Sequence, residues 1–216
     1  MKDVAVFGIG KLGKTFAVTY SRKGGKVFAI DRQERVDGIA EDVTYAIRAD
    51  VTEENVVENL GINNVDAVVV ALGNNFEASI IVTTICKSLG IPYIVASAMD
   101  KLQADVLMKI GADHVILPES ETGKRLANGM ASGGHFQDIA DLSDEFSIIE
   151  TKVPKEWIGK SLIELNPRKK FGFNVIAEKV NGVYKNNIDA DKPFGDQESI
   201  IVIGDNEKLL RVFKEG

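Results

Sequence analysis

The sequence predicts an α/β protein in which a doubly wound parallel sheet is followed by a small α+β module. Three observations in the 216 residues lead to this prediction. Short apolar runs alternate with segments of helical periodicity, a glycine-rich turn directly follows the first run, and the pattern changes to hairpin spacing after residue 146. Such alternation is typical of parallel strands that are covered by helices on both faces.

The first 131 residues supply six expected strands and the helices between them. Each apolar run is short and rich in β-branched residues, which favours buried strands. The expected strands are 4–7, 27–30, 45–49, 67–71, 93–96 and 114–117. The first expected helix includes residues 14–18, and the others cover 34–41, 53–60, 76–89, 101–110 and 119–130. Residues 1–131 are therefore the predicted first domain.

A glycine-rich polar stretch ends this pattern, and we expect residues 132–146 to be a linker. Residues 147–216 form the predicted second domain. Its expected strands are 147–153, 174–179, 183–185 and 199–203, and its closing helix is 207–214. The dipeptide Asn181-Gly182 between two of these strands favours a hairpin turn.

The first turn of the chain has the spacing of a dinucleotide-binding fingerprint, Gly8-Ile9-Gly10-Lys11-Leu12-Gly13. Glycine lacks a Cβ, so Gly8 can make a tight turn, Gly10 can let the backbone approach a pyrophosphate, and Gly13 can let the helix pack closely on the strand. The unpaired N–H groups at the helix N-terminus then face the phosphates. The turn therefore predicts a Rossmann-type domain that binds a nucleotide.

An acidic residue stands where this fold needs one, because Asp31 follows the second apolar run, eighteen residues beyond Gly13. A carboxylate at the tip of the second strand can accept hydrogen bonds from both ribose hydroxyls. The adjacent Arg32 is included in the predicted binding set. The alternative is that Asp31 is a solvated loop residue and that the glycines serve packing alone.

Two further loops at the carboxyl ends of strands complete the predicted nucleotide site. Asp50-Val51-Thr52 follows the third strand, where a loop can border the adenine. Ala71-Leu72-Gly73-Asn74 follows the fourth strand, where the chain can pass close to ribose and phosphate. The alternative for the first loop is that Asp50 or Thr52 caps the next helix.

Composition excludes several classes of function. A formal net charge of −6 argues against nucleic acid as a partner, since binding to a phosphate backbone needs a concentrated basic surface. No apolar run approaches the length that crosses a bilayer, and no signal peptide is visible, so we expect a cytosolic protein. The single cysteine, Cys86, lies in an apolar helical pattern and is expected to be a small buried hydrophobe.

Motifs for catalysis are missing from the sequence. Its two histidines, His114 and His135, lack a neighbouring carboxylate pattern suited to general acid–base chemistry. No Tyr-x-x-x-Lys pair, G-x-S-x-G turn or metal-ligand spacing occurs. A sensor that binds a nucleotide is therefore the favoured class. An NAD-dependent oxidoreductase and an adaptor that binds nothing are the competing classes.

The chain resembles the regulator of potassium conductance (RCK) proteins, in particular the TrkA/KtrA-type gating subunits of bacterial potassium uptake systems. The resemblance covers nearly the whole chain. In the first domain and at the domain junction it rests on Gly8–Gly13, Asp31, Asp50–Glu54, Ala71–Asn75, Lys109–Asp113, Pro118-Glu119 and Asp141–Glu145. In the second domain it rests on Gly159–Leu162, Phe171-Gly172, Asn174–Ala177 and Gly195-Asp196.

The resemblance implies a non-enzymatic regulatory subunit that binds ATP or ADP, with NAD⁺ or NADH as the alternative ligand. It implies a homodimer that assembles into an octameric ring beneath a membrane potassium channel subunit of the TrkH/KtrB type. The protein would then lie in the cytoplasm at the inner face of the membrane. A lysine, Lys11, stands where the family usually has arginine; it can neutralise phosphate but cannot bind it in a bidentate manner.

Two further sites follow from the resemblance. Glu119 is a candidate ligand of a nucleotide-bound divalent ion such as Mg²⁺, and its alternative is a first-turn residue that the helix dipole favours. In the second domain, cyclic di-AMP is the implied second effector. The residues at the matching positions are Leu162, Ile163, Arg168 and Asn174. The alternative there is simple dimer packing by Leu162 and Ile163.

Overall fold

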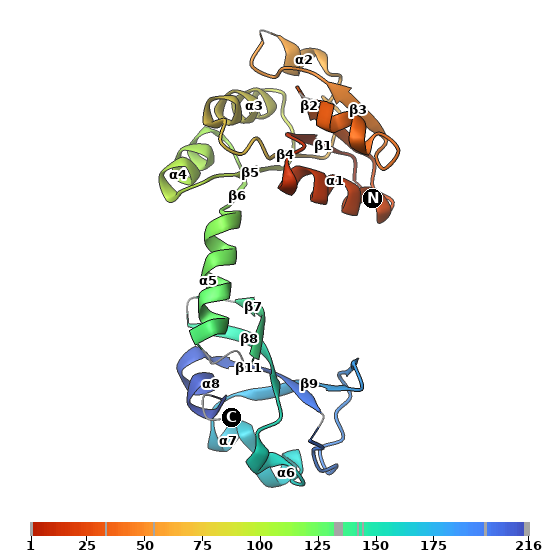
Figure 1. The fold of residues 1–216 in the computed structure, drawn as a ribbon. Coiled ribbons are helices and arrows are strands. Elements are labelled where there is room, and N and C mark those ends of the chain that lie inside the picture. The colour runs from red at the N-terminus through yellow and green to blue at the C-terminus, as the bar shows by residue number, and fades with distance from the viewer. Residues whose placement is uncertain are drawn as a thin grey trace. The chain divides into compact units, whose positions relative to one another are not determined.

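The computed structural model describes residues 2–32, 34–53, 55–131, 136–141, 143, 145–196 and 198–213 of the chain. These residues form two compact units, Met1–Glu121 and Thr122–Gly216 (Figure 1). Helix α5 (Pro118–Ala131) includes the boundary between the two units. Within the described residues, no helix has the length and apolar character that crossing a membrane requires.

The first unit contains a parallel six-stranded sheet in the order β3-β2-β1-β4-β5-β6. This order confirms the predicted doubly wound fold, because the chain starts in the middle of the sheet and builds outward in both directions. The strands are β1 (Val4–Phe7), β2 (Val27–Asp31), β3 (Tyr45–Arg48), β4 (Ala67–Val70), β5 (Ile94–Ser97) and β6 (His114–Ile116).

Three long helices of the first unit agree with the expected positions, and two segments differ. The helices are α1 (Lys11–Arg22), α3 (Phe76–Ser88) and α4 (Lys101–Ile110). The expected helix 34–41 is instead a 3₁₀ helix, η1 (Glu34–Ile39), and it contains Gly38, which disfavours a regular α-helix. The expected helix 53–60 shortens to α2 (Val56–Asn59), because Asn55 precedes it in a left-handed conformation with φ of 60°.

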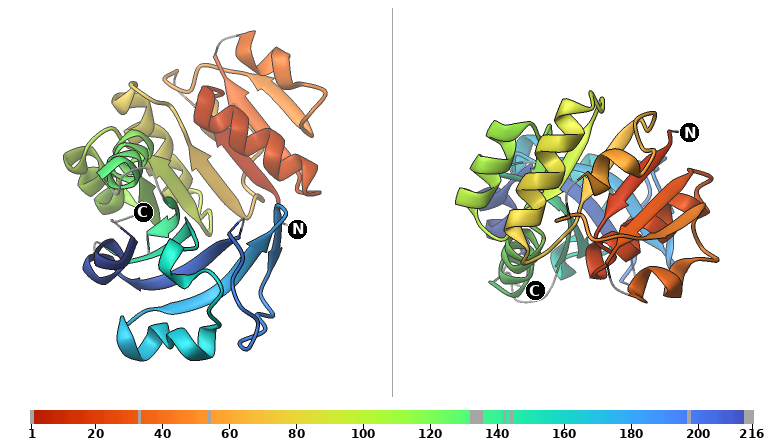
Figure 2. Two further views of the ribbon diagram at one scale, coloured as in Figure 1. Left: turned by 60° about the horizontal axis from the view of Figure 1, so that its bottom comes forward. Right: turned by 90° about the horizontal axis from the view of Figure 1, so that it is seen from above.

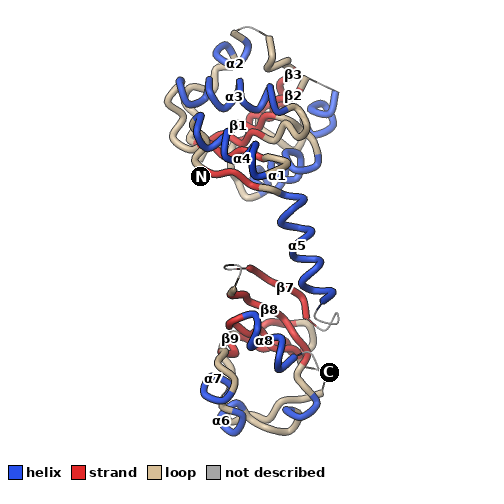
Figure 3. The backbone as a smooth tube through the Cα atoms, turned by 90° about the vertical axis from the view of Figure 1, so that its left-hand side faces the viewer, coloured by secondary structure: helices blue, strands red, loops and turns tan. Residues whose placement is uncertain are grey.

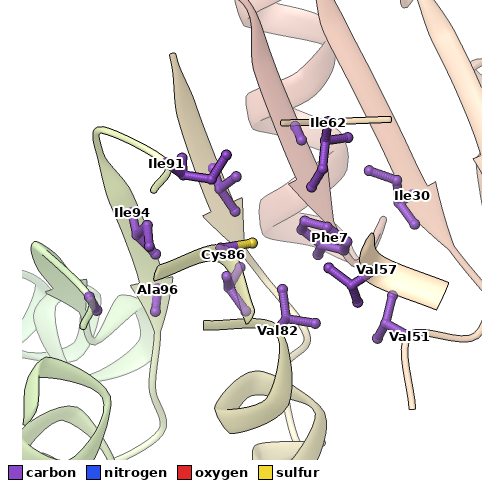
Figure 4. Packing of buried hydrophobic residues seen from close by; sticks show 14 of the residues in the cluster. Phe7, Ile30, Val51, Val57, Ile62, Val82, Cys86, Ile91, Ile94 and Ala96 are labelled. Atoms are coloured by element: carbon purple, nitrogen blue, oxygen red, sulfur yellow. The ribbon is translucent and has the colours of Figure 1, made fainter. Parts of the chain in front are cut away.

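Both faces of the central strands β1, β2, β4 and β5 are largely buried, as the β-branched runs predict, whereas the edge strand β3 is mostly exposed. Alternate residues of β1 point to opposite sides: Phe7 packs with α3 residues such as Val82, and Val6 packs with Ala17 of α1. Helices α1 and α3 accordingly lie on opposite faces of the sheet (Figure 2). Figure 4 shows the layer around Phe7, where Cys86 is fully buried as expected, and burial raises the pKa of its thiol to about 12.

The second unit contains an antiparallel sheet in the order β10-β9-β11-β8-β7. Its strands are β7 (Phe136–Asp141), β8 (Phe146–Lys152), β9 (Asn174–Val180), β10 (Val183–Lys185) and β11 (Ser199–Asp205). Its helical segments are η2 (Lys155–Trp157), α6 (Leu162–Leu165), α7 (Pro167–Lys170) and α8 (Asn206–Phe213). The predicted hairpin at Asn181 and Gly182 joins β9 to β10.

The structure corrects the prediction that residues 132–146 form a linker. Strand β7 lies within this range and pairs with β8 (Figure 3). The sequence pattern did not reveal this strand because it mixes polar with apolar residues without regular alternation and is stabilised by pairing with one neighbour. Residues 132–135, 142 and 144, which include His135, lie outside the described residues.

An aromatic cluster forms the centre of the second unit. Trp157 stacks with Phe171, Phe173 and Phe194 at ring-centroid distances of 5.7, 6.2 and 6.4 Å, and Phe213 meets it edge-on at 6.1 Å. Phe173 is only 1% exposed. Aromatic rings in such clusters stabilise the folded state through the apolar area that they bury and through the favourable geometry of their pairs. We therefore expect this cluster to stabilise the small unit.

We therefore expect Phe173→Ala to lower the free energy of unfolding by about 3–5 kcal/mol, the range for removing a buried phenylalanine. Phe146→Ala is the matched control, since Phe146 is 41% exposed and packs little. Denaturant unfolding followed by circular dichroism measures both. Equal losses for the two variants would show that the cluster is not the main support of this unit.

Candidate nucleotide-binding site

A cavity of about 440 Å³ lies at the carboxyl ends of β1 to β4. This is the point where the strand order reverses, since β1 has β2 on one side and β4 on the other. Ligands of doubly wound sheets bind in such a crevice. The cavity is lined by most of the predicted nucleotide-binding residues, namely Gly8, Gly10, Asp31, Arg32, Asp50, Val51, Thr52, Ala71, Leu72, Gly73 and Asn74.

The three glycines of the first turn have three different surroundings. Gly8 has φ of 90°, and a Cβ added to it would collide with the Ala71 carbonyl oxygen. A Cβ on Gly13 would collide with the Gly8 carbonyl oxygen, so the close packing predicted for Gly13 is present. A Cβ on Gly10 would meet no protein atom within 4 Å, although Gly10 lines the cavity. The open space beside Gly10 is therefore available to a ligand.

The N-terminus of α1 follows this turn directly. Gly10 is its N-cap and makes no side-chain capping bond, and its first turn contains no acidic residue. The positive end of the helix dipole is thus left for an anion. Ile9 is buried, and Lys11 is exposed at the first helical position. Among the predicted residues, Ile9, Lys11, Leu12 and Gly13 shape the turn but do not line the cavity.

Asp31 connects the second strand to the glycine turn. Its Oδ2 accepts a hydrogen bond of 2.7 Å from the Ile9 backbone N–H. This bond holds the carboxylate at the cavity wall, next to the turn where phosphates are expected. The position suits a group that accepts hydrogen bonds from ribose hydroxyls, and the bond to Ile9 adds a structural role that the sequence did not reveal.

Asp50 and Thr52 form a local turn after β3, and both residues line the cavity. The Asp50 Oδ1 accepts bonds from the Thr52 hydroxyl at 2.6 Å and the Thr52 N–H at 3.0 Å. These two bonds, together with the Arg32 guanidinium 4.0 Å away, hold the pKa of the Asp50 carboxyl below its usual range. Asn55 is the N-cap of α2, so neither Asp50 nor Thr52 has the alternative capping role.

The loop after β4 lines the cavity beside the glycine turn. Gly73 has φ of 61°, and the Asn75 side chain accepts a 3.1 Å bond from the Ala78 N–H, which caps α3. Asn75 lines the cavity but was missing from the predicted site, although asparagine directly before a helical pattern is an N-cap signal.

Four more lining residues were not predicted. Ile30, Ala49 and Ala78 are apolar and form part of the cavity floor, and Arg35 comes from η1. The motif arguments missed them because the dinucleotide fingerprint specifies the glycines and the acid only. The apolar residues could have been found from their places at the ends of strands or helices. No sequence signal marked Arg35.

The structure places Glu119 in the exposed first turn of α5, where it does not line the cavity. Within the described residues, no group of three or more His, Cys, Asp or Glu side chains is arranged to hold a metal ion.

The four residues expected to bind a second effector do come together. Leu162, Ile163, Arg168 and Asn174 line a hollow of about 380 Å³ in the second unit. Local signals build it: Ser161 and Glu164 form a capping box at the start of α6. Asn166, with φ of 43°, turns the chain between α6 and α7 and thereby places Arg168.

The chain is similar to known proteins along its whole length. The TrkA-N domain family matches residues 4–118. The Ktr system potassium uptake protein A of Bacillus subtilis is 35% identical over 216 residues, which cover 100% of this chain and 97% of that protein. Both units therefore have counterparts in one relative of similar length.

Two solved structures are also similar. The GsuK channel bound to NAD has a TM-score of 0.57 and 23% identity, covering 100% of this chain and 38% of that one, which shows the shared fold. GsuK bound to ADP has a TM-score of 0.52 and 27% identity, covering 60% of this chain and 34% of that one.

The different surroundings of Gly10 and Gly13 allow effects on ligand binding to be separated from effects on folding. We expect Gly10→Ala to leave the melting temperature of the free protein unchanged and to weaken ADP binding by about tenfold or more, because its methyl group fills the open space beside the helix N-terminus. Gly13→Ala should instead lower the melting temperature, since its Cβ collides with the backbone. Calorimetry and thermal melting check both, and undiminished ADP binding by Gly10→Ala would contradict the site.

Proposed function

The chain belongs to the TrkA-N domain family, and on that premise we propose that it is a non-enzymatic, nucleotide-binding regulatory subunit of a potassium uptake system. The observation that carries the proposal is the cavity at the strand reversal, with the glycine turn and Asp31 in its wall. Full-length similarity to a Ktr system protein supplies the physiological context.

The ligand we propose is ATP or ADP, with NAD⁺ or NADH as the alternative. A GsuK structure that is 27% identical over the matched region contains ADP, and its region of similarity covers 60% of this chain. A ligand shifts a protein between two shapes only by the difference in its affinity for them. Lys11, and Glu119 through a Mg²⁺ ion, are the proposed groups that distinguish ATP from ADP.

The partner we propose is an integral membrane potassium channel subunit of the TrkH/KtrB type. The chain would act as a homodimer that assembles into an octameric ring at the cytoplasmic face of the membrane. This arrangement rests on the family relationship, and it lets a change at each nucleotide site alter one shared ring.

A transport assay tests the proposal directly. The protein and a KtrB-type membrane subunit are placed together in liposomes, and potassium flux is measured with ATP, with ADP and without nucleotide. We expect flux to depend on the protein and on which nucleotide is present. The Gly10→Ala variant is the control, since it should fold but lose the response. If potassium flux with the wild-type protein does not depend on the nucleotide, the regulatory role is rejected. Steady NADH turnover with carbonyl substrates would favour the oxidoreductase alternative.

Asp31→Asn tests the ribose contact while keeping one side-chain oxygen for the Ile9 N–H. Loss of a hydrogen bond to a charged group costs about 1.5–3 kcal/mol, so ADP should bind roughly 10- to 100-fold more weakly. Binding of 2′-deoxy-ADP should weaken less, because it lacks one of the hydroxyls. Calorimetric titration measures both ligands, and equal losses would place Asp31 elsewhere than at the 2′-hydroxyl.

We further propose that the hollow in the second unit binds cyclic di-AMP, with Arg168 at a phosphate and Leu162 and Ile163 against a base. Arg168→Ala should then weaken cyclic di-AMP binding to the full chain about tenfold or more and leave ADP binding unchanged. Lys169→Ala is the matched control, since Lys169 is the adjacent basic residue and does not line the hollow. Equal effects of the two variants would favour the alternative of dimer packing.

A further inference from the structure

One part of the cavity wall has the chemistry of a base-binding slot. It lies between the segment after β2, which carries Arg32 and Arg35, and the loop after β3, which carries Ala49 to Thr52. The two segments are held together where the Ala49 N–H donates a 3.0 Å bond to the Asp31 carbonyl oxygen. Ala49 is half-buried and Val51 is 7% exposed, and these two residues give the slot an apolar side against which a flat ring can lie.

Among the described residues that line the cavity, none has an aromatic side chain that could cover the other face of such a ring. The only planar cationic groups among these residues are the guanidinium groups of Arg32 and Arg35. Arg32 faces Asp50, with its Nη1 4.0 Å from Oδ2. The Arg35 side chain makes no ion pair or hydrogen bond with the other described residues.

The position of Arg35 is set by the packing of its neighbours. Arg35 lies in η1, whose Val36 and Ile39 are each 1% exposed and pack into the core between the sheet and α1. These two anchors fix the backbone of the short helix at the cavity rim. The Arg35 side chain itself is exposed, so it is accessible to a bound ligand.

We infer that Arg35 contributes to binding of the base by stacking its guanidinium group on the exposed face of the adenine ring. The inference rests on the proposed function, because it assigns a role within the nucleotide site. A guanidinium is planar, weakly hydrated and stacks on aromatic faces, whereas the ammonium of lysine is a compact, strongly hydrated charge. The contact would hold the base between Arg35 and the apolar side of the slot.

The test is the charge-conserving variant Arg35→Lys, titrated calorimetrically with ADP and with adenosine. If the side chain stacks on the base, both ligands lose affinity by the same factor, about three- to tenfold. The matched control is Arg48→Lys, because Arg48 is an exposed arginine of neighbouring β3 that pairs with Glu34 and does not line the cavity. It should bind both ligands as the wild type does, and thermal melting without ligand checks that both variants fold.

Each other outcome has a distinct meaning. Unchanged ADP and adenosine affinities in Arg35→Lys overturn the inference. A loss for ADP alone also overturns it, since it would show that Arg35 contacts a phosphate. If the wild-type protein binds neither ligand nor any other adenine nucleotide, the proposed nucleotide site fails together with the inference. If the wild-type protein binds both ligands and Arg35→Lys binds them equally well, the nucleotide site stands and only the stacking role is removed.

Discussion

The close approach of the first turn to the loop after β4 is the constraint on which the first unit depends. Gly8 can lie against Ala71, and Gly13 against Gly8, only because both residues lack a side chain. This packing sets the start of α1 beside the centre of the sheet. It also leaves the space next to Gly10 open. One backbone arrangement therefore positions both the hydrophobic layers and the anion-binding end of the helix.

Polar groups then connect the separate loops around that opening. Asp31 reaches from the end of β2 to the Ile9 N–H, and Asp50 holds Thr52 while facing Arg32. In each case a carboxylate that lies where a ligand is expected also has a protein partner. The wall is thus largely organised before any ligand arrives, which reduces the entropy that binding has to overcome.

The sequence predicted well those features that arise from strict local requirements. The parallel sheet with helices on both faces follows from the alternation, and the roles of Gly8 and Gly13 follow from the spacing of the turn. Features that depend on tertiary pairing were missed or misjudged. Strand β7 forms by pairing with β8, although its own residues read as a linker. Arg35 reaches the cavity because Val36 and Ile39 anchor η1, a shape that helical periodicity did not indicate.

The aromatic cluster of the second unit also contains an intrinsic fluorescent probe. Trp157 is the only tryptophan of the chain, and four phenylalanine rings surround it. Fluorescence excited at the red edge of protein absorption therefore originates from the second unit alone. The melting of that unit can be followed without modification of the chain, while signals from peptide groups report on both units together. Comparison of the fluorescence signal with the peptide signal would reveal whether ligand binding to one unit changes the stability of the other.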